Sequence, residues 1–271
     1  MRGEGETSMS VLVGTAGFKY DDWRGAFYPP ALKDQDMLSY YASQFPVLEL
    51  DYTYYSMPYR RTLETMGKKT PAGFEFCVKA HKSMTHEVTE ERAAQKETFD
   101  RFFDAMQPLV EQGKFGCLLA QFPWSFKPSE AARDYIARLP ELCGGRNAVV
   151  EFRNNMWVGQ ETFDLLQKHG LGFCCVDEPR LRGLMPPVAE ATSRTSYVRF
   201  HGRNAAKWWK HDVASERYDY LYSKNELDEW LPKIESLVEK TDKVYVLFNN
   251  CHEGKAATNA RDMRLLLEPV R

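Results

Sequence analysis

Three side chains that could form one catalytic site stand at or just after the ends of short apolar runs. Glu151, Asp177 and His201 end the runs that begin near residues 148, 172 and 197. Two carboxylates and an imidazole suit general acid/base catalysis, with Glu151 as the acid/base and His201 assisting it. The same three groups could instead hold a divalent metal ion. No His-x-x-x-His or other tight ligand spacing supports a metal, so no cofactor is predicted and a divalent metal is the alternative.

Lys79 and Glu49 are two further candidate catalytic residues. Lys79 ends an apolar run, and a lysine there could form a Schiff base if its pKa were depressed. Glu49, Asp51 and Glu151 are expected on neighbouring faces, where they would keep the lysine charged, so the sequence favours an ion-paired Lys79. Glu49 and Glu151 are also the types needed for a glycosidase pair, but the sequence leaves their separation open.

Cationic, amide and aromatic side chains near the same run ends are candidates for binding a ligand. Arg153, Arg199 and Arg203 supply positive charge, and Gly202 and Gly254 lie in the two loops that often form a phosphate site in barrels. The candidate substrate-binding residues are Thr15, Asp51, His86, Gln121, Arg153, Trp157, Arg199, Arg203, Asn249, Asn250 and Asn259. The segment 207–211 (KWWKH) fits either nucleobase stacking or a lid packed by its own tryptophans.

Eight short β-rich runs carry these residues. They cover 11–15, 47–53, 74–79, 117–122, 148–153, 172–177, 197–201 and 244–249. Helical spacing of apolar residues fills most intervals, at 36–45, 60–68, 93–113, 129–139, 160–169 and 223–239, with a last helix from Asn259 to Pro269. Only 178–196 lacks a helical pattern. Eight alternating units predict a single TIM-type (β/α)8 barrel with parallel strands, and the missing Gly-x-Gly-x-x-Gly disfavours an open doubly wound sheet.

In such a barrel the active site lies at the C-terminal ends of the strands. Residues two apart on a strand share a face, so Glu151 should lie beside Arg153, and Arg199 beside His201. The sequence therefore predicts a mouth with acids from strands two, five and six facing cations from strands three, five and seven. A structural ion-pair network in the upper barrel is the alternative for each single residue.

The composition suits one globular domain. The chain has 271 residues, 43% of them hydrophobic, and a net charge of −2, which gives no general attraction to nucleic acid or membranes. Residues 1–10 are expected to be a disordered lead-in, and 11–271 the barrel. No apolar run is long enough to span a membrane, and six scattered cysteines suggest buried thiols in a reducing cytoplasm.

Several stretches of the sequence resemble the motifs of a known family. They are GTAGFKY (14–20), WRGAFYP (23–29), LELDYTYY (48–55), FCVK (76–79), QFP (121–123), VEFR (150–153), YVRFHGR (197–203) and FNN (248–250). With these stretches the sequence resembles the YecE-like family, a domain of unknown function (number seventy-two). The resemblance implies a TIM-type barrel and implies no reaction. Phe18 and Asp51 depart from the Trp and Asn that the family tends to have, and Asp51 adds a carboxylate to the mouth.

Three functions fit these residues. The first is an enzyme, of the hydrolase, isomerase or lyase type, that acts on a small phosphorylated or otherwise anionic substrate by acid/base chemistry. The second is a metal-dependent phosphodiesterase that acts on nucleic acid. The third is a non-enzymatic barrel that binds a ligand or a partner. The sequence does not decide among them, and it leaves the oligomeric state open.

Overall fold

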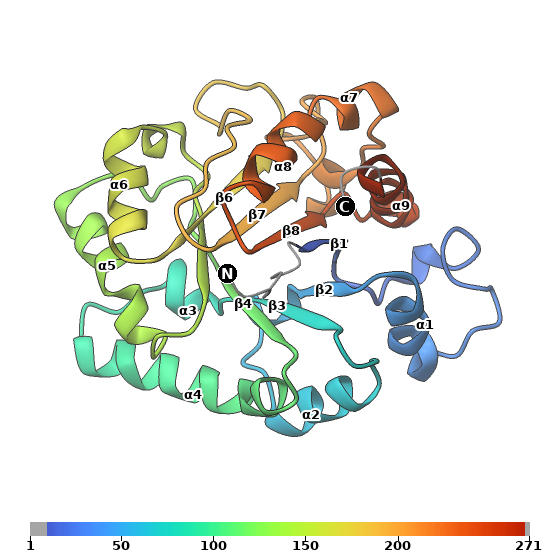
Figure 1. The fold of residues 1–271 in the computed structure, drawn as a ribbon, viewed down its shortest axis with the longest axis horizontal. Coiled ribbons are helices and arrows are strands. Elements are labelled where there is room, and N and C mark those ends of the chain that lie inside the picture. Colours follow the sequence, from blue (N-terminus) through green and yellow to red (C-terminus); the bar gives the residue numbers. More distant parts are fainter. Residues whose placement is uncertain (1–9, 269–271) are drawn as a thin grey trace, which may run out of the picture.

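The computed structural model describes residues 10–268, and its centre is a closed barrel of eight parallel strands in sequence order (Figure 1). The strands are β1 (Ser10–Ala16), β2 (Val47–Leu50), β3 (Glu75–Lys79), β4 (Phe115–Gln121), β5 (Ala148–Glu151), β6 (Gly172–Asp177), β7 (Thr195–Phe200) and β8 (Lys243–Phe248). The barrel closes because β8 pairs with β1 over six residues, from Ser10↔Lys243 to Thr15↔Phe248. The predicted (β/α)8 barrel is confirmed.

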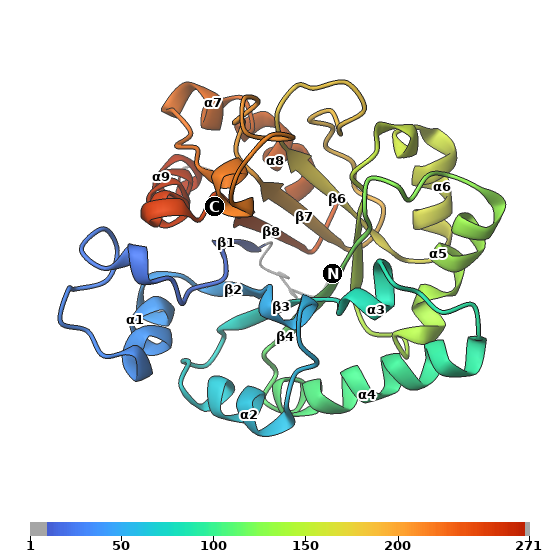
Figure 2. The same ribbon diagram turned by 180° about the vertical axis from the view of Figure 1, so that it is seen from behind.

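Helices surround the barrel and follow most strands (Figure 1). The longer ones are α1 (Met37–Gln44), α2 (Arg60–Lys68), α4 (Arg92–Glu111), α5 (Glu130–Leu142), α6 (Gln160–Lys168), α8 (Leu231–Val238) and α9 (Lys255–Leu267). Two short helices are α3 (Lys82–Thr85), which lies between β3 and α4, and α7 (Lys224–Asp228) (Figure 2). As predicted, the segment between β6 and β7 contains no helix.

Several helix boundaries differ from the sequence prediction. The expected helix 223–239 is divided at Trp230, because Pro232 lacks a backbone N–H and is tolerated only in the first turn of a new helix, α8. Pro140 does not end α5, which continues to Leu142. The last helix starts at Lys255 after a left-handed Gly254, so Asn259 lies inside α9 rather than at its cap. Pro269 lies outside the described residues.

Strand β2 is shorter than predicted, and this changes which side chains share a face. The strand ends at Leu50, and Tyr52–Tyr54 form a short 3-10 helix, η3, with Asp51 preceding it. The Thr53 hydroxyl donates hydrogen bonds to the carbonyls of Leu50 and Lys79. The predicted strand over 47–53 is therefore too long, and Thr53 does not lie on the same strand as Glu49.

The side chains of β7 and β8 show which residues point out of the barrel. Phe200 stacks on Phe248 with ring centroids 4.5 Å apart, and Phe200 also contacts Trp230 next to α8. Side chains alternate along a strand, so Arg199 points into the barrel. This alternation decides which of the predicted site residues meet.

The described chain includes residues 10–268, so most of the expected lead-in lies outside it, although Ser10 begins β1. All six cysteines are free and buried, as predicted. No helix within 10–268 combines the length and hydropathy that crossing a membrane requires.

Trp157, a predicted substrate-binding residue, lies in a buried stack outside the barrel mouth. Its ring is nearly parallel to Phe152 at 4.3 Å and to Phe126 at 5.4 Å, and its indole N–H donates to the Phe126 carbonyl. The side chain has no exposed surface. Trp157 therefore joins the loop after β5 to the loop after β4, and the predicted contact with a substrate is wrong.

Because Trp157 fills this stack completely, Trp157→Ala should lower the free energy of unfolding by about 3–5 kcal/mol, measured by urea denaturation. Trp209→Ala is the matched control, since 56% of Trp209 is exposed and little packing is lost. Equal unfolding midpoints for the two variants would contradict the structural assignment of Trp157.

Candidate functional site

Arg199 lies at the centre of a buried ion network inside the barrel. Its guanidinium donates to Glu49 through Nε at 2.9 Å and Nη2 at 2.5 Å, and to Glu151 Oε2 through Nη1 at 2.9 Å. Tyr197 donates a further hydrogen bond to Glu49 at 2.7 Å. Strands β2, β5 and β7 are thus joined by one cation. Arg199 is 1% exposed and paired on both sides, so its predicted role in substrate binding stays a prediction.

Glu151 contacts three basic side chains. Besides Arg199, it lies 2.7 Å from Nε of Arg153 and 3.0 Å from Nε2 of His201. Burial alone would raise the pKa of Glu151, but Arg153, Arg199 and His201 together hold it well below its ordinary value. Glu151 is therefore a permanently ionised carboxylate at neutral pH. A carboxylate with so low a pKa is a weak proton carrier, so this arrangement does not favour the predicted role of Glu151 as general acid/base.

His201 is a neutral bridge in this network. Its Nδ1 lies 3.0 Å from the amide nitrogen of Asn249, and its Nε2 faces Glu151. Burial, followed by the charge of Arg153, lowers the pKa of His201 to about 3. This pattern fits the tautomer in which Asn249 donates to Nδ1 and the Nε2–H donates to Glu151. Both ring nitrogens are occupied, so His201 and Asn249 are not free to contact a ligand through them.

Asp177 points away from Glu151 and His201. Its register partner on β7 is Phe200, which faces the helices. Its carboxylate accepts two hydrogen bonds from Arg203 at 2.8 Å, one from Tyr222 at 2.9 Å and one from Trp230 at 2.8 Å. The predicted convergence of Glu151, Asp177 and His201 is therefore wrong. Within residues 10–268 no three His, Cys, Asp or Glu side chains are arranged to hold a metal ion.

Thr15 and Arg203 also lie away from the mouth. Thr15 faces α1, where its hydroxyl contacts Tyr41 and donates to the Gly17 carbonyl. Arg203 has its charge neutralised outside the barrel by Asp177 and Glu229. Neither residue is placed to bind a ligand at the strand ends, contrary to the prediction.

Asn250 and Asn259 hold the loop before α7 against α9. Asn259 accepts from the Tyr222 amide and donates to the Tyr222 carbonyl, and Asn250 donates to the Tyr220 carbonyl at 2.8 Å and to Asn259 at 2.9 Å. Both asparagines have no exposed surface. Both hold the loop in place, and Asn250 Oδ1 has no hydrogen-bond partner among the described residues, so their predicted contact with a substrate stays a prediction.

A pocket at the C-terminal ends of the strands, here called the mouth pocket, brings together four of the predicted residues. Its volume is about 260 Å³. The lining residues are Tyr54, Tyr55, Lys79, His86, Gln121, Pro123, Trp124, Arg153, Leu184, Trp208, Trp209, Arg217 and Tyr218. No carboxylate is among these described residues. Lys79, His86, Gln121 and Arg153 are therefore placed where the sequence predicted a site.

Lys79 is an unpaired cation in the mouth pocket. Its ammonium lies 4.6 Å from the centre of the Tyr54 ring, and it makes no hydrogen bond or ion pair with any described residue. Burial, followed by the charge of Arg199, lowers the pKa of Lys79 to about 8. The predicted ion-paired lysine is wrong, because Arg199 occupies both Glu49 and Glu151.

Arg153 and Arg217 add two more guanidinium groups. Arg153 is balanced by Glu151 and by Glu178, whose Oε2 lies 3.0 Å away. Arg217 contacts Nε2 of His211 at 3.0 Å and lies 5.9 Å from the Trp208 ring. Its Nε is buried without a hydrogen-bond partner in the described part of the chain. Sequence reasoning missed Arg217 because it lies in η5 (Ala214–Tyr218), inside a long loop with no strand end to mark it.

His86 and the two adjacent tryptophans complete the rim. His86 lies edge-on to Tyr54 at 4.8 Å, and burial, followed by Lys79 and Arg153, lowers its pKa to about 4. Trp208 is buried 6.5 Å from the His201 ring, whereas Trp209 is exposed and meets Trp124 edge-on at 6.4 Å. The segment 207–211 thus contributes one packed tryptophan and one rim tryptophan to the mouth pocket.

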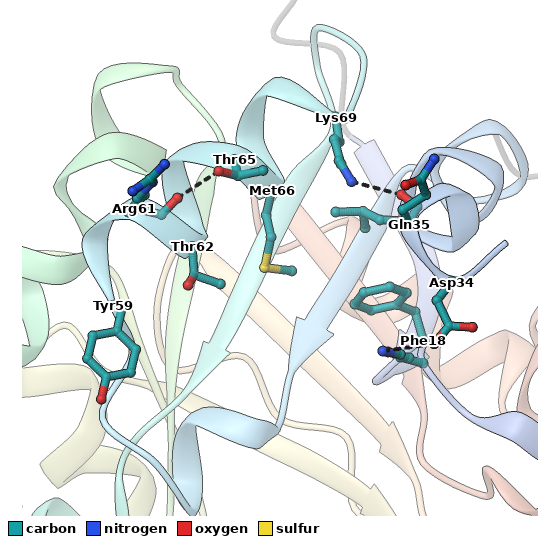
Figure 3. Close-up of a pocket in the computed structure, with 11 residues that line it drawn as sticks. Phe18, Asp34, Gln35, Tyr59, Arg61, Thr62, Thr65, Met66 and Lys69 are labelled. Carbon is teal, nitrogen blue, oxygen red and sulfur yellow. Dashed lines mark hydrogen bonds and ion pairs between the residues drawn. The ribbon is translucent and has the colours of Figure 1, made fainter.

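A second cavity lies outside the barrel, between α2 and the segment from Phe18 to Leu38. It has a volume of about 580 Å³. Figure 3 shows Lys69 reaching toward Gln35, whose carbonyl accepts from the Lys69 ammonium at 2.8 Å. Lys19 pairs with Asp34 at 3.1 Å. These two cations are already satisfied, and none of the predicted site residues lines this cavity.

Comparison with known proteins identifies the family of this chain. The family described as "Protein of unknown function DUF72" matches residues 12–270. The chain belongs to the DUF72 family. The UPF0759 protein YunF of Bacillus subtilis is 33% identical over 270 residues, which is 95% of each chain.

Two crystal structures of DUF72 proteins share the fold. The protein from Thermotoga maritima is 40% identical, with a TM-score of 0.87 over 95% of this chain and 99% of that one. The protein from Enterococcus faecalis is 26% identical, with a TM-score of 0.85 over 95% of each chain. The resemblance inferred from the sequence motifs is confirmed, and it indicates no particular reaction.

In this DUF72 protein, Arg199→Met should lower the free energy of unfolding at pH 7 by about 3–5 kcal/mol, because two buried carboxylates lose their shared cation. The folded-state pKa of Glu151 is depressed, so its stabilising contribution is present above the unfolded pKa of about 4.3 and is lost as pH falls below it. The loss caused by Arg199→Met should therefore stay constant between pH 7 and about pH 5 and shrink as the pH falls from about 4.3 to 3, as measured by urea denaturation.

Arg194→Met is the matched control, because the Arg194 side chain is exposed and its pair with Asp242 lies at the surface. Its unfolding midpoint should stay close to that of the unmodified protein at pH 7 and at pH 3. A destabilisation by Arg199→Met that is the same at pH 3 and pH 7 would argue for lost packing alone.

Proposed function

We propose that this protein is an enzyme that acts on a small anionic molecule bound in the mouth pocket. The observation that carries the proposal is the charge of the lining: Lys79, Arg153 and Arg217 line it, and no carboxylate does. Lys79 and Arg217 have no acidic partner in the described residues. A partly desolvated cation without a counter-ion is unfavourable, and an anionic ligand would supply the missing charge.

The arrangement of the neighbouring acids explains why the ligand must bring the negative charge. Arg199 holds both Glu49 and Glu151. Asp51 does not line the pocket, and burial raises its pKa, which favours its neutral form. Glu178 is taken by Arg153 and by the Met185 amide, which donates at 2.8 Å. The cations at the mouth therefore outnumber the carboxylates that are free to reach them.

The rest of the lining supports a ligand that also contains a planar or apolar part. Six of the lining side chains are Tyr or Trp rings, at 54, 55, 124, 208, 209 and 218. Aromatic faces pack well against rings and unsaturated groups. The volume of about 260 Å³ is at the small end of ligand pockets, which favours a metabolite-sized molecule over a polymer segment.

The proposed acid/base groups are Lys79 and His86, which line this pocket. Lys79 has a pKa of about 8, so it can gain or lose a proton near neutral pH. His86 has a pKa of about 4 and is neutral there, so it can accept a hydrogen bond or a proton. These two side chains replace Glu151 and His201 as the proposed proton carriers.

Arg217→Gln should weaken the binding of phenyl phosphate about tenfold or more, because a charge-assisted hydrogen bond is lost. Binding is measured by tryptophan fluorescence, since Trp124, Trp208 and Trp209 line the pocket. Inorganic phosphate should bind more weakly than phenyl phosphate, because it leaves the rings uncovered.

Lys224→Gln removes an exposed charge on α7 and is the matched control, so its affinity should equal that of the unmodified protein. Failure of both phosphates to bind at physiological ionic strength would refute the anion site. Tight binding with no turnover of any phosphate, carboxylate or carbonyl compound would instead support the non-enzymatic function.

A further inference from the structure

We propose that Lys79 is a nucleophilic amine that forms an imine with the aldehyde or ketone carbon of a small anionic ligand in the mouth pocket. The inference rests on the proposed function and names its substrate class as anionic carbonyl compounds, such as oxo acids. The position of Lys79 among its neighbours carries the inference.

A comparison of two lysines shows what is unusual about Lys79. Lys114 is buried, and its ammonium donates three hydrogen bonds, to the carbonyls of Gly67 and Thr70 at 2.6 Å and to the Thr70 hydroxyl at 2.9 Å. All its donors are used, as expected of a structural lysine. Lys79 ends β3 in the mouth pocket and has no such partners in the described residues. Its nitrogen is therefore free to react with a bound molecule.

The surroundings of Lys79 favour the neutral amine that attack on a carbonyl requires. The charged and titratable groups around it come from five parts of the fold: Glu49 and Asp51 at β2, Tyr54 in η3, His86 after α3, Glu151 and Arg153 at β5, and Arg199 on β7. Burial and the arginines outweigh the acids, because Arg199 neutralises Glu49 and Glu151. At a pKa of about 8, roughly a tenth of the molecules carry the neutral amine at pH 7.

The chemistry needs no oxidant, reductant or other co-reactant. The lone pair of the Lys79 nitrogen forms a bond to the carbonyl carbon, and the π electrons move to oxygen. The nitrogen loses a proton and the oxygen gains one, which gives a carbinolamine. Loss of water breaks the C–O bond and leaves C=N. Arg217 and Arg153 would hold the anionic group and so fix the carbonyl beside the amine.

The test is reductive trapping of the full-length protein with glyoxylate and cyanoborohydride, followed by peptide mass spectrometry. The reduced adduct should form at Lys79 in preference to other lysines, and more slowly at pH 6 than at pH 8. Inorganic phosphate should slow it by competing for the arginines. Acetaldehyde, which has no charge, should label Lys79 much less.

One variant tests the inference and a second serves as its control. Lys79→Arg should abolish the preferred adduct, and Lys82→Arg, which replaces an exposed lysine of α3, should not change it. Should Lys79→Arg fail to fold, protection of Lys79 by phosphate in the unmodified protein gives the same information.

The possible failures are distinct. Phenyl phosphate binding without preferred labelling of Lys79 overturns the imine and leaves the anion site intact. Equal labelling of Lys79 by glyoxylate and acetaldehyde overturns the anionic substrate class. Absence of both anion binding and labelling overturns this inference together with the proposed function.

Discussion

The ion pairs of Arg199 determine the chemistry that remains available at the mouth of this barrel. One buried guanidinium joins β2, β5 and β7 through Glu49 and Glu151. A buried charge is tolerated only when it is paired and hydrogen-bonded, and here one cation serves two carboxylates. The same pairing removes both acids from the reach of Lys79. The stability of the barrel interior and the free amine at its mouth therefore have a common cause.

A second polar cluster, on the helix side of the barrel wall, is separate from the first. Asp177 accepts hydrogen bonds from Arg203, Tyr222 and Trp230, and it fixes the long loop after β7 to α7 and α8. This loop carries Trp208 and Arg217 to the mouth pocket. Asp177 thus influences the site by positioning this loop, although it points out of the barrel and Glu151 points into it.

The sequence predicted the fold well because the alternation of strand and helix is a local pattern, and each of the eight parallel units repeats it. It also predicted that Glu151 would lie beside Arg153 and His201, since side-chain spacing on short strands fixes their common face. It placed Asp177 on the wrong face, because the apolar run GFCCV that precedes Asp177 does not show which side points inward. Arg217 and the pairing of Lys79 depend on contacts between distant segments, and local spacing does not encode these.

Two groups at the mouth have their proton equilibria shifted toward neutrality by the same physical cause. Burial is the largest influence on both Lys79 and Asp51: it lowers the pKa of the amine and raises the pKa of the carboxyl. A close ion pair between them would shift both in the opposite directions, and none is formed. Asp51 is a protonatable group close enough to the amine for the charge of Lys79 to act on its pKa. Acid/base catalysis requires a group whose proton exchange lies near neutral pH, and burial without pairing gives Lys79 a pKa of about 8.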